Sequence, residues 1–189
     1  PEGATLVVGH NAKDKEECAK MIHEGRWSEF IREVPIRKGD FVSIVPGTVH
    51  AIKAGVMLLE TQQNSDITYR VYDYDRLSNG RKRELHIEKS IDVINAPASP
   101  AQDSIHNFAN VRKNKPVLME KSAYYKVWKL VVEDGSELQL SREKDFDSSY
   151  LLASVVAGSG YINGTAIKKG DHFIVTNECD SLSFSGDME

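Results

Sequence analysis

The N-terminal part of the chain changes from a strand-like pattern to a helical one. The apolar run 4–8 predicts a short strand. Residues 14–17 then have the spacing of a capping box, and apolar side chains recur at intervals of three and four residues up to Gly25. These apolar positions are Cys18, Met21 and Ile22. The pattern predicts a short amphipathic helix whose apolar face lies in the core.

The same spacing continues into a second helical piece. Trp27, Phe30 and Ile31 follow it. Pro35 is expected to stop this helix, because proline lacks an N–H and restricts the residue before it. An aromatic stripe of this kind is typical of a helix that faces the core.

From Ile36 onward the pattern favours strands. Short runs of β-branched and aromatic residues are separated by Gly, Asn and Asp, which is typical of an antiparallel all-β architecture. The expected strands lie at 41–45, 56–61 and 68–74. After the turn signal Asn79-Gly80, residues 85–94 return to helical spacing, with Ile87, Ile91 and Ile94 on one face.

Strand signals resume in the C-terminal part. The expected strands are 124–133, 151–157, 165–167 and 173–175, and the expected turns are Asp134-Gly135, 158–160 and Asn163-Gly164. The proline-rich stretch 95–100 and the polar residues after it are typical of a surface connection. The sequence therefore predicts an all-β chain with a short helical insertion. We expect a first domain at 1–95, a linker at 96–122 and a second β domain at 123–189.

An internal echo links the two β regions. Residues 35–41, which contain Lys38-Gly39-Asp40, are answered by 166–173, which contain Lys169-Gly170-Asp171. A Lys-Gly-Asp turn followed by an apolar strand, repeated in β-rich surroundings, predicts duplicated barrels. The copies differ in chemistry, because the first continues to His50 and the second has no histidine in the matching place.

Composition narrows the function classes. The chain is 40% hydrophobic and 28% charged with a net charge of -4, so it has no general attraction to nucleic acid or anionic membranes. A bound phosphate would have to meet a local cluster of cations. Two cysteines and the absence of an apolar run of about 18–20 residues favour a reduced, cytoplasmic setting.

Two segments carry candidate chemistry. His50 follows a Pro-Gly turn, and its neutral imidazole could ligate a metal or serve as a hydrogen-bonded structural residue. The segment 59–70 is polar where its flanks predict a buried strand. Strand alternation would place Glu60 with Gln62, and Thr68 with Arg70, on shared faces. These faces could line a cavity or be solvated, with Glu60 paired to Arg70 or Lys89.

Other polar residues are weaker candidates. Residues 72–76 favour a strand end and turn over a platform for stacking a sugar. His86 and Glu88 favour capping or surface ion pairs. The remaining histidines are isolated, and the sequence has no glycine-rich phosphate loop, nucleophile elbow or paired-cysteine metal motif.

Three phrases carry a resemblance to a known family. They are Gly-Thr-Val-His-Ala-Ile at 47–52, Leu-Glu-Thr-Gln-Gln-Asn-Ser-Asp-Ile-Thr-Tyr-Arg-Val-Tyr-Asp-Tyr-Asp-Arg at 59–76, and Arg-Glu-Leu-His-Ile-Glu-Lys-Ser-Ile-Asp-Val-Ile at 83–94. The chain resembles type I mannose-6-phosphate isomerases, especially their short bacterial form. The resemblance implies duplicated cupin-like jelly-roll barrels, of which the second is metal-free. It also implies a C-terminal portion of such an enzyme, with further zinc ligands upstream.

The resemblance also implies roles for individual residues. His50 matches a zinc ligand and Arg70 an active-site arginine, while Glu60 and Asp66 match acidic residues of the pocket. The implied reaction interconverts mannose 6-phosphate and fructose 6-phosphate by proton transfer between C1 and C2. Zn²⁺ is the implied cofactor, and the sugar phosphate is the implied partner.

We expect these residues to divide the chemistry. Glu60 is the candidate for proton transfer, and Arg70 would stabilise the developing negative charge. Asp66, Gln62 and Lys89 are the candidates for binding the substrate.

Two other functions remain open from the residues. One is a cupin module that binds a sugar without catalysis. The other is a cupin oxygenase with two histidines and one carboxylate, for which no second histidine stands at a convincing spacing.

Overall fold

The structure is a computed structural model that describes residues 3–65, 67–133 and 137–189. It divides into two compact units, with the boundary between Asn107 and Phe108. Among the described residues, strands outnumber helices in both units, in line with a mainly β fold. The predicted turn Asp134-Gly135 lies outside the described residues.

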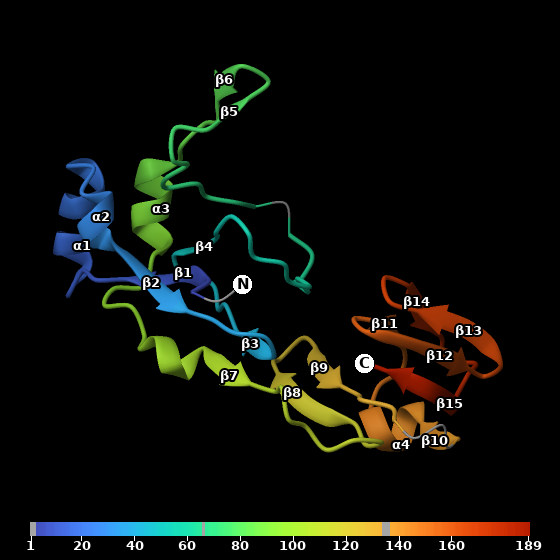
Figure 1. Cartoon of the computed structure of the whole chain (residues 1–189). Coiled ribbons are helices and arrows are strands. Elements are labelled where there is room, and N and C mark those ends of the chain that lie inside the picture. The colour runs from blue at the N-terminus through green and yellow to red at the C-terminus, as the bar shows by residue number, and fades with distance from the viewer. Residues whose placement is uncertain (1–2, 66, 134–136) are drawn as a thin grey trace. The chain divides into compact units, whose positions relative to one another are not determined.

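Unit 1 combines short antiparallel strands with a helical layer. Its elements are β1 (Thr5–His10), α1 (Lys15–His23), α2 (Trp27–Phe30), β2 (Ile31–Pro35), β3 (Asp40–Val42), β4 (His50–Ile52), β5 (Leu77–Ser78), β6 (Arg81–Lys82), α3 (Ile87–Val93), a 3-10 turn (Ala101–Asp103) and β7 (Ile105–Asn107) (Figure 1). β1 lies between β2 and β4, β3 pairs with β7, and β5 pairs with β6.

The apolar run predicted as the first strand is β1. Val7 and Val8 are both buried, so the strand is covered on both faces. Val8 lies opposite His50 in the antiparallel pairing of β1 with β4. This pairing places the candidate metal ligand on the edge strand of the sheet.

The helical layer confirms two sequence predictions. Asp14 caps α1, because its carboxylate accepts the Glu17 N–H at 2.8 Å. α1 and α2 lie beside α3 (Figure 1), and their apolar residues form one buried cluster. Its members are Ala12, Cys18, Met21, Ile22, Phe30, Ile91 and Ile94.

The second helical piece is shorter than predicted. α2 ends at Phe30, and Ile31 already begins β2. The backbone of β2 pairs with β1, with Val34 opposite Leu6. β-branched side chains suit such a pairing better than a helix, so Pro35 ends a strand and not a helix.

Two predicted strands of unit 1 do not form. Residues 56–61 and 68–74 have no strand assignment in the described chain. Met57, Leu59 and Ile67 are 90%, 52% and 67% exposed, respectively. A strand is stabilised by a continuous ladder of backbone hydrogen bonds to a partner strand, and neither segment has such a ladder among the described residues.

Unit 2 is built around an open four-stranded sheet. Its elements are β8 (Val117–Lys121), β9 (Lys126–Lys129), β10 (Leu138–Ser141), α4 (Arg142–Phe146), β11 (Leu151–Ser154), β12 (Gly158–Ile162), β13 (Thr165–Lys168), β14 (His172–Val175) and β15 (Ser181–Met188). The sheet order is β10-β15-β12-β13, and β11 pairs with β14. No sheet among the described residues closes on itself, so the predicted barrels are not confirmed.

The glycine-rich segment 158–160 is a strand and not the predicted turn. A side chain on Gly160 would lie 2.2 Å from the Ser185 carbonyl oxygen, so only glycine allows β12 to approach β15 this closely. The Asn163-Gly164 turn is confirmed, since both residues have positive φ and join β12 to β13 in a two-residue hairpin.

The internal echo corresponds to the same turn in both units. The Asp40 carboxylate accepts the Arg37 N–H at 2.8 Å, and the Asp171 carboxylate accepts the Lys168 N–H at 2.8 Å. The glycine before each aspartate has φ near 90°. The equivalence is therefore one of backbone geometry.

The predicted linker is partly structured. Within 96–122, β7 pairs with β3 of unit 1, and β8 pairs with β9 of unit 2. The chain passes from one unit to the other inside this segment.

None of the helices in the described ranges is both long and apolar enough to cross a bilayer.

His10 is a buried titratable group in the core of unit 1. Its Nε2–H donates to the Asn95 carbonyl oxygen at 2.9 Å, and its Nδ1 accepts the Ala12 N–H at 3.2 Å. The ring stacks on Phe30 with 5.0 Å between the ring centres. Burial lowers the pKa of His10, and a proton on Nδ1 would face the Ala12 donor.

We expect the free energy of unfolding to depend on pH through His10. Because the folded-state pKa lies below the ordinary 6.5, the unfolded chain binds this proton more readily. Stability is therefore retained above pH 6.5 and lost as pH falls through the lowered folded-state pKa.

Urea unfolding between about pH 8 and pH 5 measures this effect. His10→Asn keeps an acceptor for Ala12 but cannot titrate, so it should flatten the pH dependence. His23→Asn alters an exposed histidine and serves as the control. Equal slopes for His10→Asn and the wild type would contradict the prediction.

Candidate functional site

Arg70 is held by two of the three residues that precede α3, Glu84 and His86. Its N–H donates to His86 Nδ1 at 3.1 Å, and its carbonyl oxygen accepts the His86 N–H at 2.7 Å. Its guanidinium Nη1 donates to the Glu84 carbonyl oxygen at 3.2 Å. The backbone and the side chain of Arg70 are thus both fixed, although no strand forms around this residue.

The guanidinium of Arg70 has donors available for an anion. It forms no ion pair with a carboxylate of a described residue, and the same is true of Lys89. Lys89 Nζ lies 5.9 Å from the Tyr69 ring centre, and the His86 ring lies 6.0 Å from the same ring. Lys89 is therefore a cation beside the ring of the residue that precedes Arg70, and an ammonium group suits an anionic ligand.

His50 is exposed on β4, and one of its ring nitrogens has no hydrogen-bond partner among the described residues. Its Nδ1 lies 2.9 Å from the Thr48 carbonyl oxygen, which can only accept, so the proton is on Nδ1. Nε2 then carries a lone pair. A backbone carbonyl that holds the other ring nitrogen is the usual arrangement for a histidine that binds a metal.

The loop that leads to His50 is attached to the C-terminal end of α3. The Asn95 side chain donates to the Pro46 carbonyl oxygen at 2.8 Å, and the Asn95 N–H donates to the Gly47 carbonyl oxygen at 3.0 Å. α3 has 7 residues, so the helix is roughly 10 Å long. His50 and Arg70 are therefore both positioned by contacts at the ends of this one helix.

The other predicted site residues are not brought into contact with this pair. Glu60 and Gln62 are exposed in a segment without regular structure. Neither of the ion pairs that the sequence allowed, Glu60 with Arg70 or with Lys89, forms in the described chain. Asp66 lies outside the described residues.

An ion cluster near α2 was not found by sequence reasoning. Asp73 is buried and accepts from Arg83 Nε at 2.8 Å and from Arg76 Nη2 at 2.7 Å. The Arg83 hydrogen bond, followed by that of Arg76, holds the pKa of Asp73 well below its usual range. Tyr72 stacks on Trp27 at 4.6 Å, beside a cavity of about 140 Å³. The turn predicted at 72–76 is thus also an anchor to the helical layer.

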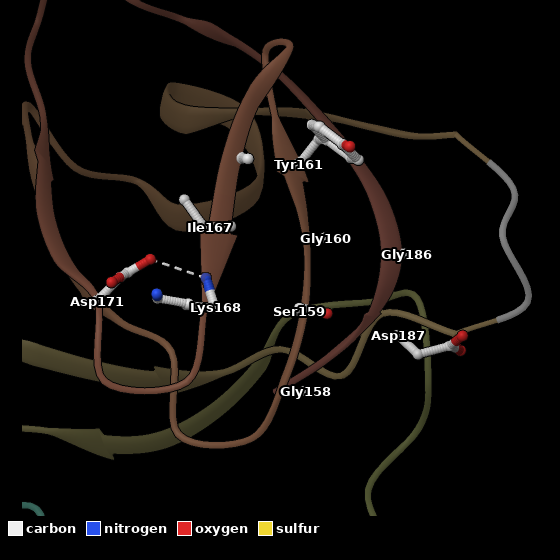
Figure 2. Close-up of a pocket in the computed structure, with 10 residues that line it drawn as sticks. Gly158, Ser159, Gly160, Tyr161, Ile167, Lys168, Asp171, Gly186 and Asp187 are labelled. Carbon is white, nitrogen blue, oxygen red and sulfur yellow. Dashed lines mark hydrogen bonds between the residues drawn. The ribbon is translucent and has the colours of Figure 1, made fainter.

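A separate, wider cavity of about 640 Å³ lies in unit 2. Figure 2 shows Lys168 and Asp171 on one side of it, and Tyr161 and Asp187 on the other. Gly160 and Gly186 lie opposite each other in β12 and β15 (Figure 2). Because neither residue has a side chain, the space between these groups stays open. Asp171 is already bonded to the Lys168 N–H, so this carboxylate serves the turn.

The described residues offer few metal ligands in one place. Within the ranges 3–65, 67–133 and 137–189, no three His, Cys, Asp or Glu side chains gather in a way that could hold an ion. His50 fits one coordination position. The described residues do not fit a complete zinc site, which normally has at least three protein ligands.

Comparisons with known proteins find relatives that are named mannose-6-phosphate isomerase. No model of a known protein family matches the chain. The chain is 42% identical over 197 residues to mannose-6-phosphate isomerase of Streptococcus mutans, covering 100% of this chain. It is 42% identical over 191 residues to a mannose-6-phosphate isomerase of Bacillus subtilis, covering 98% of this chain.

A solved structure agrees with these relatives. The crystal structure of mannose 6-phosphate isomerase from Bacillus subtilis matches with a TM-score of 0.85 and 34% identity over 100% of this chain. The resemblance expected from the sequence is confirmed, and the chain is a homologue of mannose-6-phosphate isomerases. It spans 58% of the length of both curated relatives and 59% of the solved chain.

The contact between the His50 loop and α3 predicts a graded response to alanine. Gly47 and Gly55 have φ of 82° and 80°, so alanine at either position costs about 1–2 kcal/mol in backbone strain. A Cβ at Gly47 would also lie 2.6 Å from the Val93 carbonyl oxygen, whereas Gly55 faces open space. Gly47→Ala should therefore lower the free energy of unfolding by about 1–3 kcal/mol more than Gly55→Ala.

Denaturant unfolding of both variants measures this difference. Gly55→Ala is the matched control, because it carries the strain without the collision. Equal destabilisation by the two substitutions would show that the loop is not seated on α3.

Proposed function

We propose that the natural polypeptide carrying this chain interconverts mannose 6-phosphate and fructose 6-phosphate. The observation that carries the proposal is Arg70, whose guanidinium is fixed by Glu84 and has no described carboxylate partner. The names of the relatives supply the substrate pair. The arginine is a donor that could meet negative charge on a sugar oxygen.

The proposed reaction moves one proton between neighbouring carbons. A base removes the C2 proton of the open-chain aldose, and the electron pair forms a C1–C2 double bond while the C1 carbonyl oxygen becomes negatively charged. That oxygen is then protonated, the C2 hydroxyl loses its proton to form the ketone, and C1 receives a proton. Arg70 would stabilise the charged enediolate, and Glu60 is the proposed base.

We assign the substrate-binding roles to residues on either side of Arg70. Lys89 lies near Tyr69, and its ammonium group, which forms no ion pair with a described residue, could meet a phosphate or hydroxyl group. Gln62 and Asp66 are proposed to bind sugar hydroxyls. Glu60 and Gln62 are exposed, so they are accessible to a ligand from solvent.

Zinc is the proposed cofactor, and His50 would contribute one ligand through Nε2. When bound, the ion would act as a Lewis acid toward the sugar oxygens. The remaining ligands would have to come from outside the described residues. We further propose that the two units are cupin-like domains joined within 96–122, the second of them metal-free. The matching Lys-Gly-Asp turns support a common origin.

The activity can be tested directly on the natural full-length polypeptide. We expect it to convert mannose 6-phosphate to fructose 6-phosphate, to lose this turnover with a chelator, and to regain it with added Zn²⁺. The readout is the amount of each sugar phosphate with time. A folded, zinc-loaded polypeptide that binds the sugar phosphate without turnover would instead indicate a sugar-binding cupin.

Arg70→Ala should reduce kcat by about 10²- to 10³-fold, because the enediolate loses its fixed donor. Bound zinc, measured by elemental analysis, should stay at the wild-type level. Arg81→Ala, at an exposed position in β6, is the matched control and should leave kcat unchanged. Near-normal turnover of Arg70→Ala would remove this residue from the mechanism.

A further inference from the structure

His86 stands directly before α3, yet its side chain does not cap the helix. The ring makes no hydrogen bond to an N–H of the first helical turn. Its Nδ1 instead accepts the N–H of Arg70, a residue 16 positions earlier in the sequence. The His86 ring therefore serves Arg70 and not the helix that it precedes.

The two residues exchange hydrogen bonds in both directions. The Arg70 N–H donates to the His86 ring, and the His86 N–H donates to the Arg70 carbonyl oxygen at 2.7 Å. The ring nitrogen thus occupies the place that a carbonyl oxygen has in a β ladder. This arrangement fixes the Arg70 backbone in a segment that has no sheet of its own.

The hydrogen bonds also set the protonation of the ring. Because Arg70 supplies the donor, Nδ1 must be unprotonated, and the neutral ring carries its proton on Nε2. Nε2 lies 4.0 Å from the Glu84 carboxylate, and the Glu84 carbonyl oxygen accepts from the Arg70 guanidinium. Glu84 and His86 together hold the backbone and the side chain of Arg70.

His86 is attached to a helix that packs in the core of unit 1. Its carbonyl oxygen accepts the Ser90 N–H at 2.8 Å, the first bond of α3. Ile91 and Ile94 then anchor the helix in the core with α1 and α2. A displacement of Arg70 would have to break the contacts at the start of a helix that is fixed in the core.

We propose that His86 is a positioning residue that holds Arg70 in the orientation required for the reaction. The proposal rests on the proposed function for its catalytic consequence. The hold on Arg70 itself can be tested whether or not the polypeptide turns over a sugar phosphate.

The experiment compares two substitutions at His86 in the natural full-length polypeptide. His86→Asn places an amide oxygen near the position of Nδ1 and keeps the acceptor, whereas His86→Leu removes it. His23→Ala is the control, because His23 is exposed and its ring pairs with Glu88 of α3. If His86→Leu does not fold, His86→Gln, whose amide lies one carbon further out, takes its place.

Two readouts are taken on each variant. Amide hydrogen exchange of Arg70 by NMR reports the hold on its backbone, and steady-state kinetics report its consequence. We expect slow exchange in the wild type, His86→Asn and His23→Ala, and fast exchange in His86→Leu. In the same variant kcat should fall about 10- to 100-fold with KM nearly unchanged, and His86→Asn should recover most of the loss.

The outcomes separate the two ideas. Slow Arg70 exchange in His86→Leu would overturn the proposal, and so would fast exchange with an unchanged kcat. If the wild type has no isomerase turnover but the exchange pattern is as expected, the proposed function fails and the hold of His86 on Arg70 stands.

Discussion

The attachment of the C-terminal end of α3 is the interaction on which the candidate site depends. Lys15 Nζ donates to the carbonyl oxygens of Asp92 at 3.0 Å and Ile94 at 2.6 Å, and His10 donates to that of Asn95. These acceptors would otherwise be unsatisfied at the helix end, and an ammonium there also complements the helix dipole. These hydrogen bonds join α3 to the start of α1 and to the end of β1. They fix the position of the helix relative to the sheet that contains β1.

The position of α3 in turn determines where the two candidate residues, His50 and Arg70, are held. At the C-terminal end of α3, Asn95 holds the loop that leads to His50. At the N-terminal end, His86 and Glu84 hold Arg70. A candidate metal ligand and a candidate anion-binding group can therefore keep a constant separation, although the described residues of 53–76 form no strand and no helix. Burial of Ile91 and Ile94 stabilises the site from a distance.

Elements defined by local physics could be predicted from the sequence. α1 and α3 follow from apolar spacing, and the hairpin at 163–164 follows from the ability of Asn-Gly to adopt positive φ. Predictions that needed a distant partner were less reliable. The β propensity of 56–61 favours a strand when the segment is paired and half buried. In the described chain this segment forms no strand pairing and is mostly exposed.

The candidate site shows the same division. His50 and Arg70 could be identified because their side chains carry recognisable chemistry within a distinctive sequence. The roles of His86 and Asn95 could not be identified from the sequence. Each side chain bonds backbone groups, and residue types do not tell where a backbone group of a distant segment will lie. Asp73 was assigned to a turn for a similar reason, because its two arginine partners become close only after 72–83 has folded.

The two units share the geometry of one turn, but the segments that follow the turn differ in their side chains. The turns at Asp40 and Asp171 use the same side-chain hydrogen bond and the same positive φ at the preceding glycine. These requirements are met within four residues and constrain nothing beyond the turn. After Asp40 the chain reaches a loop seated on α3, whereas after Asp171 it continues into β14 and a turn without histidine. The turn is therefore a shared local geometry, and the presence of α3 behind the following loop distinguishes the unit with candidate chemistry.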